Sequence, residues 1–177
     1  MLLPLAYYGH PVLRKKTDPV QEINHEIRQL ISDMLETMYK ENGIGLAAPQ
    51  IFKSLSIFVT CVPVYADEKE VTPGVERVFI NPKILSYSEE NDTLPEACLS
   101  IPKVSGYVTR PLKIVVEYMN LEGKTETQEF TDYEARCIMH ENDHINGKLF
   151  IDRMESKERK EIEPKLREVK KKFSSKK

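Results

Sequence analysis

The chain has 177 residues; 40% are hydrophobic, 31% are charged, and the formal net charge is -2. These values are typical of a globular protein that buries one sizeable core, and they exclude a disordered or a membrane-embedded chain. The first residues lack the basic segment of a secretory signal, and no later apolar run approaches membrane-spanning length. We therefore expect a single domain, residues 1–177, that is monomeric, has no membrane partner and stays in the cytoplasm.

The first element in chain order is an amphipathic helix over residues 23–38. Its apolar residues recur at spacings of three and four, as expected for one buried helix face. They are Ile23, Ile27, Leu30, Ile31, Met34, Leu35 and Met38. Asn24 is placed to cap the start of this helix, and Gly43 lies just beyond its end.

The next segment, GIGLAAPQ at 43–50, imitates the glycine fingerprint of dinucleotide-binding proteins. That fingerprint must follow a strand and open a helix, whereas this segment follows a helix and leads toward a strand. We therefore exclude a dinucleotide site. The glycines are better suited to let the backbone approach a bound substrate closely, and Gln50 offers a neutral amide donor.

Short runs with β character follow the glycine segment. They lie at 56–60, 77–81, 83–88, 112–119 and 124–130, and prolines and a polar stretch at 65–74 separate them. Strands in series between two helices indicate an α+β fold and not the alternation of a doubly wound sheet. We expect short-strand sheets, antiparallel or mixed, packed around a central second helix.

This second helix carries signals at both ends. Thr131 followed by Glu134 forms the pattern of a capping box at its start, and Gly147 is suited to a left-handed cap at its end. Before Gly147 the helix contains the pentapeptide HENDH at 140–144.

Two histidines of this pentapeptide can bind one metal ion. His140 and His144 are four residues apart, so they share a helix face. Glu141 lies about 100° around the helix from His140, where its carboxylate can act as a base beside the ion. Such a string also arises by chance, and paired helical histidines can simply cap or pack. We expect the remaining histidines, His10 and His25, in surface or turn positions.

A third ligand is needed, because a catalytic ion of this type takes three protein ligands and keeps one position open. Cys61, Cys98 and Cys137 cannot all pair in disulfides, so free thiols or a metal ligand are favoured. Cys137 lies about 7.5 Å along the helix axis from the midpoint of the two histidines, too far for a short side chain. Cys98 is free to approach from another segment.

The last element is basic. Residues 155–177 contain 10 Lys and Arg against 5 Glu, so this tail has a charge of about +5 and the rest of the chain about -7. A helix interrupted or started at Pro164 is expected. Such a tail is usually a solvated helix face or a frayed end, and the alternative is attraction to a polyanion.

Three of these segments together resemble the peptide deformylase family, whose signatures read GxGLAAxQ, EGCLS and QHExDH. The first matches in full at 43–50, the second reads EACLS at 96–100, and the third reads MHENDH at 139–144. The resemblance extends from YYGHPVLR at 7–14 to GKLFIDRM at 147–154. Ala97 replaces the family glycine and Met139 the family glutamine, which puts the surroundings of the ligands in question but not the chemistry.

The resemblance implies a hydrolase that removes the formyl group from the N-formylmethionine of new chains. A divalent ion, natively ferrous iron, is held by Cys98, His140 and His144, although zinc, nickel or cobalt suits the same ligands. Glu141 moves protons for the water activated by the ion. The amide of Gln50 and the backbone N–H of Leu99 stabilise the oxyanion by analogy with the family.

Substrate specificity is expected to follow from sterics. A slot formed by Gly43, Ile44 and Gly45 can admit a formyl group while it crowds an acetyl group, and Ile44 and the helix face near Cys137 are candidates to contact the methionine side chain. For Arg110 and Glu96, a structural ion pair and direct substrate contact both remain open.

Two rival functions use the same residues, a zinc endopeptidase and a structural metal site in a binding module. A structural site would be closed by four protein ligands and would not need Glu141. Because deformylases act during protein synthesis, we also expect the basic tail to attract the chain to ribosomal RNA near emerging peptides.

Overall fold

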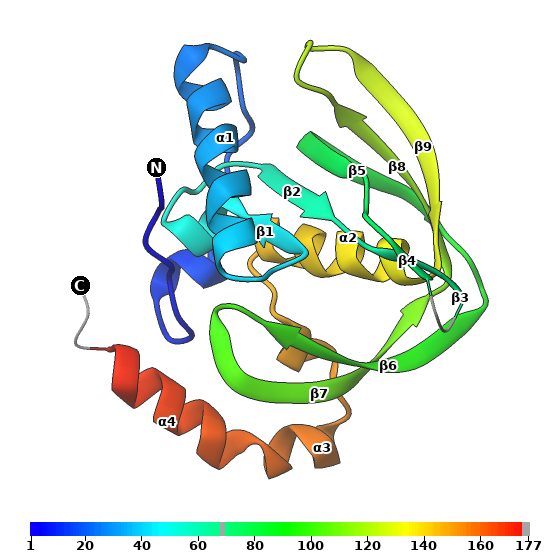
Figure 1. Ribbon diagram of the computed structural model, residues 1–177. Coiled ribbons are helices and arrows are strands. Elements are labelled where there is room, and N and C mark those ends of the chain that lie inside the picture. Colours follow the sequence, from blue (N-terminus) through cyan, green and yellow to red (C-terminus); the bar gives the residue numbers. More distant parts are fainter. Residues whose placement is uncertain (68–69, 175–177) are drawn as a thin grey trace.

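A computed structural model describes residues 1–67 and 70–174 (Figure 1). Its centre is an antiparallel five-stranded sheet with the order β1-β2-β5-β8-β9. The strands are β1 (Gly45–Ala47), β2 (Ile57–Cys61), β5 (Glu76–Tyr87), β8 (Lys113–Met119) and β9 (Thr125–Thr131). Helix α2 (Asp132–Ile145) follows β9 directly and lies against this sheet, as Figure 1 shows. The α+β prediction with a central second helix is confirmed.

Alternation along the strands places one apolar cluster on each face of the sheet. In β2, Phe58 packs with Ile138 of α2, whereas Ile57 and Val59 pack with Met34 of helix α1. Helix α1 (His25–Lys40) therefore covers the opposite face of the sheet from α2. The predicted cap of α1 is confirmed, because Asn24 Oδ1 accepts the N–H of Ile27 at 2.9 Å.

A second layer is formed by the hairpin of β6 (Asn91–Cys98) and β7 (Ile101–Pro111). Its apolar side packs on the C-terminal helix α4 (Glu163–Phe173), and the short helix α3 (Ser156–Glu161) before it also contacts β7. The fold also contains the hairpin of β3 (Val64–Asp67) and β4 (Glu70–Thr72) and the short 3-10 helices η1 (Pro11–Arg14), η2 (Ala48–Ile51) and η3 (Phe150–Arg153). In the described part of the chain, no helix combines the length and the apolar character needed to cross a bilayer.

Several expected strand boundaries are wrong. The runs at 77–81 and 83–88 form one continuous strand, β5, which has register shifts between Ile80 and Lys83 and between Ile84 and Ser86. The polar stretch at 65–74 contains part of the β3–β4 hairpin instead of only separating strands. Strands β6 and β7 were not expected, because Pro95, Pro102 and several charged residues weaken the local strand signal.

The capping box of α2 is a further error, whereas its C-terminal cap is confirmed. Thr131 occupies the N-cap position without a side-chain cap bond, and Glu134 instead accepts a hydrogen bond from Arg77 Nε at 2.8 Å. Gly147 has a φ of 73°, and the N–H of Lys148 donates to the Asp143 carbonyl at 2.9 Å, as in a Schellman cap.

The tail is helical as expected, and α4 begins at Glu163 with Pro164 in its first turn. Within the described residues α4 has one buried face, where Leu166 and Val169 pack against β7, and one exposed face, which agrees with the expected solvated helix face. Its lysines at 170–172 are exposed, while residues 175–177, which include Lys176 and Lys177, lie outside the described residues. His10 and His25 are exposed, and His10 accepts the N–H of Val12 in a turn.

Candidate metal centre

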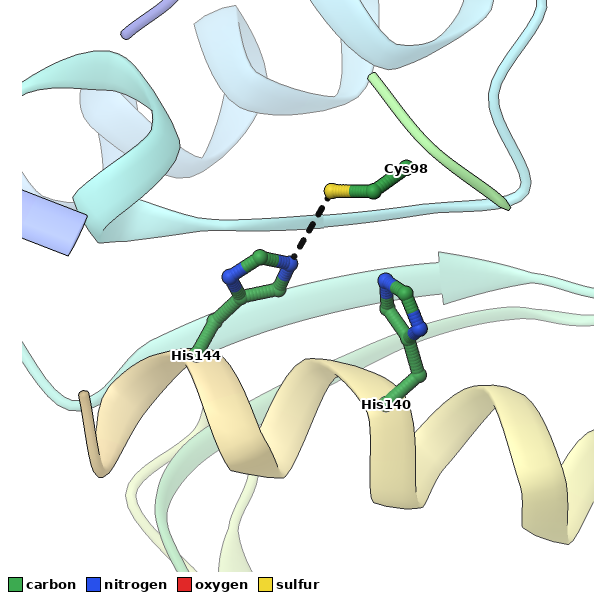
Figure 2. A group of neighbouring side chains, drawn as sticks. All are labelled: Cys98, His140 and His144. Carbon is green, nitrogen blue, oxygen red and sulfur yellow. Dashed lines mark hydrogen bonds between the residues drawn. The ribbon is translucent and has the colours of Figure 1, made fainter. Parts of the chain in front are cut away.

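The structure brings the three predicted metal ligands together. The side chains of His140 and His144 rise from one side of α2, and Cys98, at the end of β6, approaches from across the helix (Figure 2). Their ligand atoms all lie within 4.8 Å of one another, and Cys98 Sγ is 3.4 Å from His144 Nε2. Sulfur and nitrogen ligands of one tetrahedral ion are about 3.5 Å apart, so these residues fit a metal ion.

Glu96 fixes the orientation of one ligand. Its Oε1 lies 2.9 Å from His140 Nδ1, which donates the hydrogen bond and leaves Nε2 for an ion. Glu96 and Cys98 are two residues apart in β6, so a single strand supplies a ligand and the partner of a second ligand. Burial alone would raise the pKa of Glu96, but hydrogen bonds from His140 and Arg110 outweigh burial and lower it to about 2. The Glu96 carboxylate next to the ligands therefore stays ionised at neutral pH.

Arg110 belongs to a buried ion-pair network. Its guanidinium donates to both oxygens of Glu96, at 2.6 and 2.9 Å, and to Asp143 at 3.0 Å. Arg136 also donates to Glu96, at 2.7 Å, and Arg153 holds Asp143 from its other side at 2.9 Å. The side chain of Arg110 is only 5% exposed, so the structural ion pair, and not direct substrate contact, describes its role.

Cys137 is not part of the ligand cluster, in agreement with the helix geometry. Its side chain lies on α2 but outside the group of ligand atoms that share one centre. Burial, with the nearby carboxylates of Glu141 and Glu96, raises the pKa of its thiol far above the usual range. A thiol that stays protonated is a poor metal ligand.

Glu141 is buried beside the histidines and packs against the backbone of β1. A Cβ atom added to Gly45 would lie 2.6 Å from Glu141 Oε1, so only glycine leaves room for this carboxylate. Its Oε2 has no hydrogen-bond partner among the described residues. Burial raises the pKa of Glu141 to about 7, which suits a group that accepts and returns a proton near neutral pH.

Gln50 lies next to the cysteine ligand and is almost fully buried. Its Oε1 accepts the N–H of Ala47 at 3.0 Å, and its Nε2 donates to Ser100 Oγ at 3.1 Å. The same Nε2 is 3.5 Å from Cys98 Sγ. These contacts orient the amide so that its N–H side faces the ligand cluster.

A cavity of about 1000 Å³ connects these groups. All predicted site residues except His144 line it, namely Gly43, Ile44, Gly45, Gln50, Cys98, Leu99, His140 and Glu141. The sequence did not reveal that Arg136 and Asp143 belong to the ion-pair network or that Ser100 binds Gln50. It also did not place Tyr7 and Phe173 in the cavity wall. The one available signal was Arg136, a charged residue within the apolar stretch ARCIM of α2.

The two departures from the signature motifs leave this geometry intact. Met139 is buried and packs in the apolar cluster between α2 and the sheet, where a glutamine amide would need partners. Ala97 lies at a register shift between β6 and β7 but has no positive φ, so its backbone does not require glycine.

A thiol and two imidazoles that share one centre, with a buried carboxylate and a cavity beside them, are the groups of a hydrolytic metal site. A family model described as polypeptide deformylase matches residues 2–160. The chain belongs to the peptide deformylase family.

Relatives from distant bacteria and eukaryotes support this membership of the deformylase family. A peptide deformylase of Chlorobaculum parvum is 42% identical over 173 residues, which cover 96% of this chain and 89% of the relative. A peptide deformylase of Pseudothermotoga lettingae is 44% identical over 169 residues, which cover 96% of this chain and 92% of the relative. A crystal structure of peptide deformylase from Plasmodium falciparum superposes with a TM-score of 0.88 at 34% identity, covering 97% of this chain and 98% of that one.

Proposed function

We propose that the chain hydrolyses the formyl group of N-formylmethionine at the start of newly synthesised proteins and releases formate. The observation that carries this proposal is the cluster of Cys98, His140 and His144, at which Cys98 and His140 share one cavity with the buried carboxylate of Glu141. A purely structural ion would have no use for that carboxylate or for the cavity.

The described residues divide the reaction among them. When bound, a divalent ion supplies Lewis acidity that polarises the formyl carbonyl and makes a water molecule more acidic. Glu141 accepts one proton from this water as the water oxygen attacks the formyl carbon. The carbon–nitrogen bond then breaks as Glu141 delivers this proton to the leaving amine, and the formic acid that is released loses its remaining proton to solvent and becomes formate.

Gln50 and Leu99 act on the formyl oxygen. The Gln50 amide, whose Nε2 already faces Cys98 Sγ at 3.5 Å, turns one N–H toward the oxygen as negative charge develops there. The backbone N–H of Leu99, the residue after the cysteine ligand, donates from the same wall of the cavity. Because both donors are neutral, they stabilise the charged transition state more than the uncharged substrate.

Gly43, Ile44 and Gly45 form the wall that separates formyl from acetyl substrates. A formyl carbon carries only hydrogen, so it fits beside a backbone without side chains, whereas a methyl group would collide with it. The carboxylate of Glu141 also restricts this space, because it occupies the position next to Gly45.

Three substrates tested side by side distinguish the candidate functions. We expect rapid formate release from formyl-Met-Ala, no hydrolysis of acetyl-Met-Ala and no cleavage of an internal peptide bond. Cleavage of the internal bond would indicate an endopeptidase. An inert protein with a full complement of metal would indicate a structural site.

We further propose ferrous iron as the resident ion, supported by the thiol ligand and by the family. Zinc, nickel and cobalt accept the same ligand set, so the residues alone do not choose between them. Metal analysis of protein purified without air should give about one iron per chain. One zinc per chain under those conditions would contradict the assignment.

We also propose that the chain acts as a single monomeric domain in the cytoplasm, where the exposed lysines of α4 attract it to ribosomal RNA. Replacing Lys170, Lys171 and Lys172 by glutamine should weaken co-sedimentation with ribosomes at low salt. The same change should leave the rate on formyl-Met-Ala intact. Equal co-sedimentation of both proteins would remove the ribosome proposal, and a dimeric mass by light scattering would remove the monomer.

A further inference from the structure

Two aromatic residues from opposite ends of the sequence lie together at the wall of the catalytic cavity. Tyr7, from the N-terminal segment, and Phe173, the last residue of α4, line the same cavity as Cys98 and His140. Their rings are stacked, with centroids 3.7 Å apart and an interplanar angle of 13°. Figure 1 shows the end of α4 close to the N-terminal segment. Neither ring is fully buried, so the pair presents an apolar surface to whatever occupies the cavity.

The N-terminal segment is fixed relative to the catalytic residues. The N–H of Ala6 donates to the Gln50 carbonyl at 2.7 Å, and the N–H of Tyr8 donates to the Ser100 carbonyl at 2.8 Å. Alternation then directs Leu5 and Tyr7 to the cavity, while Ala6 is buried on the other side. The neighbours of Tyr7 are therefore bonded to the segment that holds Gln50 and to the residue that lies two positions after the cysteine ligand.

The partner ring is anchored independently. Leu166 and Val169 bury one face of α4 against β7, and this packing places Phe173 at the helix end. The ammonium group of Lys172 lies 5.5 Å from the centroid of the Phe173 ring. Glu41, which acts electrostatically on Tyr7, lines the cavity as well, so charges of both signs lie near the pair and only its apolar ring surface can select a side chain.

The cavity is larger than one formylated residue requires. Its volume of about 1000 Å³ lies at the upper end of the range that encloses a whole drug-sized ligand. A nascent peptide continues beyond its first residue and adds about 3.3 Å per residue when extended. The space beyond the metal centre is therefore available to the residues that follow the methionine.

We propose that Tyr7 and Phe173 form a subsite for an apolar side chain at the third or fourth residue of the formylated peptide. This inference rests on the proposed function, since it concerns the substrate of the same site. It assigns the C-terminal helix a part in substrate selection, in addition to its packing role.

The test compares two tetrapeptides, formyl-Met-Ala-Phe-Phe and formyl-Met-Ala-Ser-Ser, with formyl-Met-Ala as the substrate that lacks downstream residues. We expect the native protein to prefer the Phe-Phe peptide. Phe173→Ala should reduce this preference in kcat/KM by about fivefold to tenfold, mainly through KM, because aromatic contacts contribute on that scale. Phe173→Leu should retain most of the preference.

Tyr107→Ala is the matched control, because Tyr107 is an exposed aromatic residue of β7 that does not line the cavity. It should keep the native preference. An unchanged preference in Phe173→Ala, or an equal loss of rate on all three substrates, would overturn the subsite. Failure of the native protein to hydrolyse formyl-Met-Ala would instead contradict the proposed function itself.

Discussion

At the scale of single residues, Gly45 has a role that its sequence motif did not reveal. The motif predicts that the glycine-rich segment leaves open space for the formyl group. At Gly45 this space is occupied, because a Cβ added there would lie 2.6 Å from Glu141 Oε1. Glycine at position 45 therefore leaves room for the carboxylate of Glu141, in addition to any role in admitting the substrate.

Gly45→Ala should lower kcat by about 10²-fold while the metal remains bound, because a displacement of the base by about 1 Å costs that much. Gly43→Ala is the comparison, since the closest contact of its Cβ would be the flexible end of the Leu99 side chain, at 3.0 Å, and the backbone oxygens of Met38 and Gly45 would lie at ordinary contact distances of 3.4 and 3.5 Å. Its loss of rate should be smaller. Equal losses in the two variants, measured as formate release, would show that the slot and not the base is affected.

Gln50 provides a second test at this scale. Gln50→Leu should lower kcat by about 10²- to 10³-fold with little change in KM, the usual cost of losing one oxyanion donor. Metal content should be measured alongside, because Gln50 also contacts Cys98. A higher KM with an unaltered kcat would make Gln50 a substrate-binding residue instead.

At the scale of elements, strand β6 combines two functions. Its alternation puts Cys98 and Glu96 on one side, so the metal ligand and the partner of His140 arrive together. Helix α2 supplies the two histidines and the base from the opposite side of the site. The centre is therefore assembled between two elements that pack in different layers.

Glu96→Gln should weaken metal binding by about 10- to 100-fold, the usual effect of altering the partner of a histidine ligand. The amide keeps the shape of the side chain but loses the charge that Arg110 and Arg136 now balance. Titration with a competing chelator measures this change. A curve identical to that of the native protein would show that Glu96 serves only the ion-pair network.

Helix α4 offers a stability test. Leu166 is fully buried, so Leu166→Ala should lower the free energy of unfolding by about 2 to 5 kcal/mol in urea denaturation. Arg167→Ala, on the exposed side of the same helix, should change it by less than about 0.5 kcal/mol. Similar values for the two variants would show that the packing of α4 against β7 does not stabilise the protein and would favour a frayed end.

For the whole molecule, the sequence predicted best what is local. The first helix and its Asn24 cap, the C-terminal cap at Gly147 and the shared helix face of His140 and His144 all depend on residues within a few positions of one another. The motifs also identified Cys98 as a ligand. Cys98 is distant in sequence from the two histidines, and only the resemblance to the deformylase family groups the three residues in one metal site.

The remainder depends on pairings between distant segments. The β6–β7 hairpin is stabilised by its apolar contacts with η3 and α4, which overcome the unfavourable prolines within its strands. Thr131 and Glu134 satisfy a local capping pattern, yet Arg77 from β5 binds Glu134 instead. The Tyr7–Phe173 pair joins the two ends of the chain, so no local pattern in the sequence indicated it.

In the proposed mechanism Cys98, His140 and His144 hold the ion while Glu141 moves the proton. Metal content and formate release, measured together in Cys98→Ala, Cys137→Ala and Glu141→Ala, separate these roles. We expect loss of both in Cys98→Ala, retention of both in Cys137→Ala, and retained metal with lost activity in Glu141→Ala. Metal loss in Cys137→Ala with retention in Cys98→Ala, or full activity in Glu141→Ala, would contradict this division of roles.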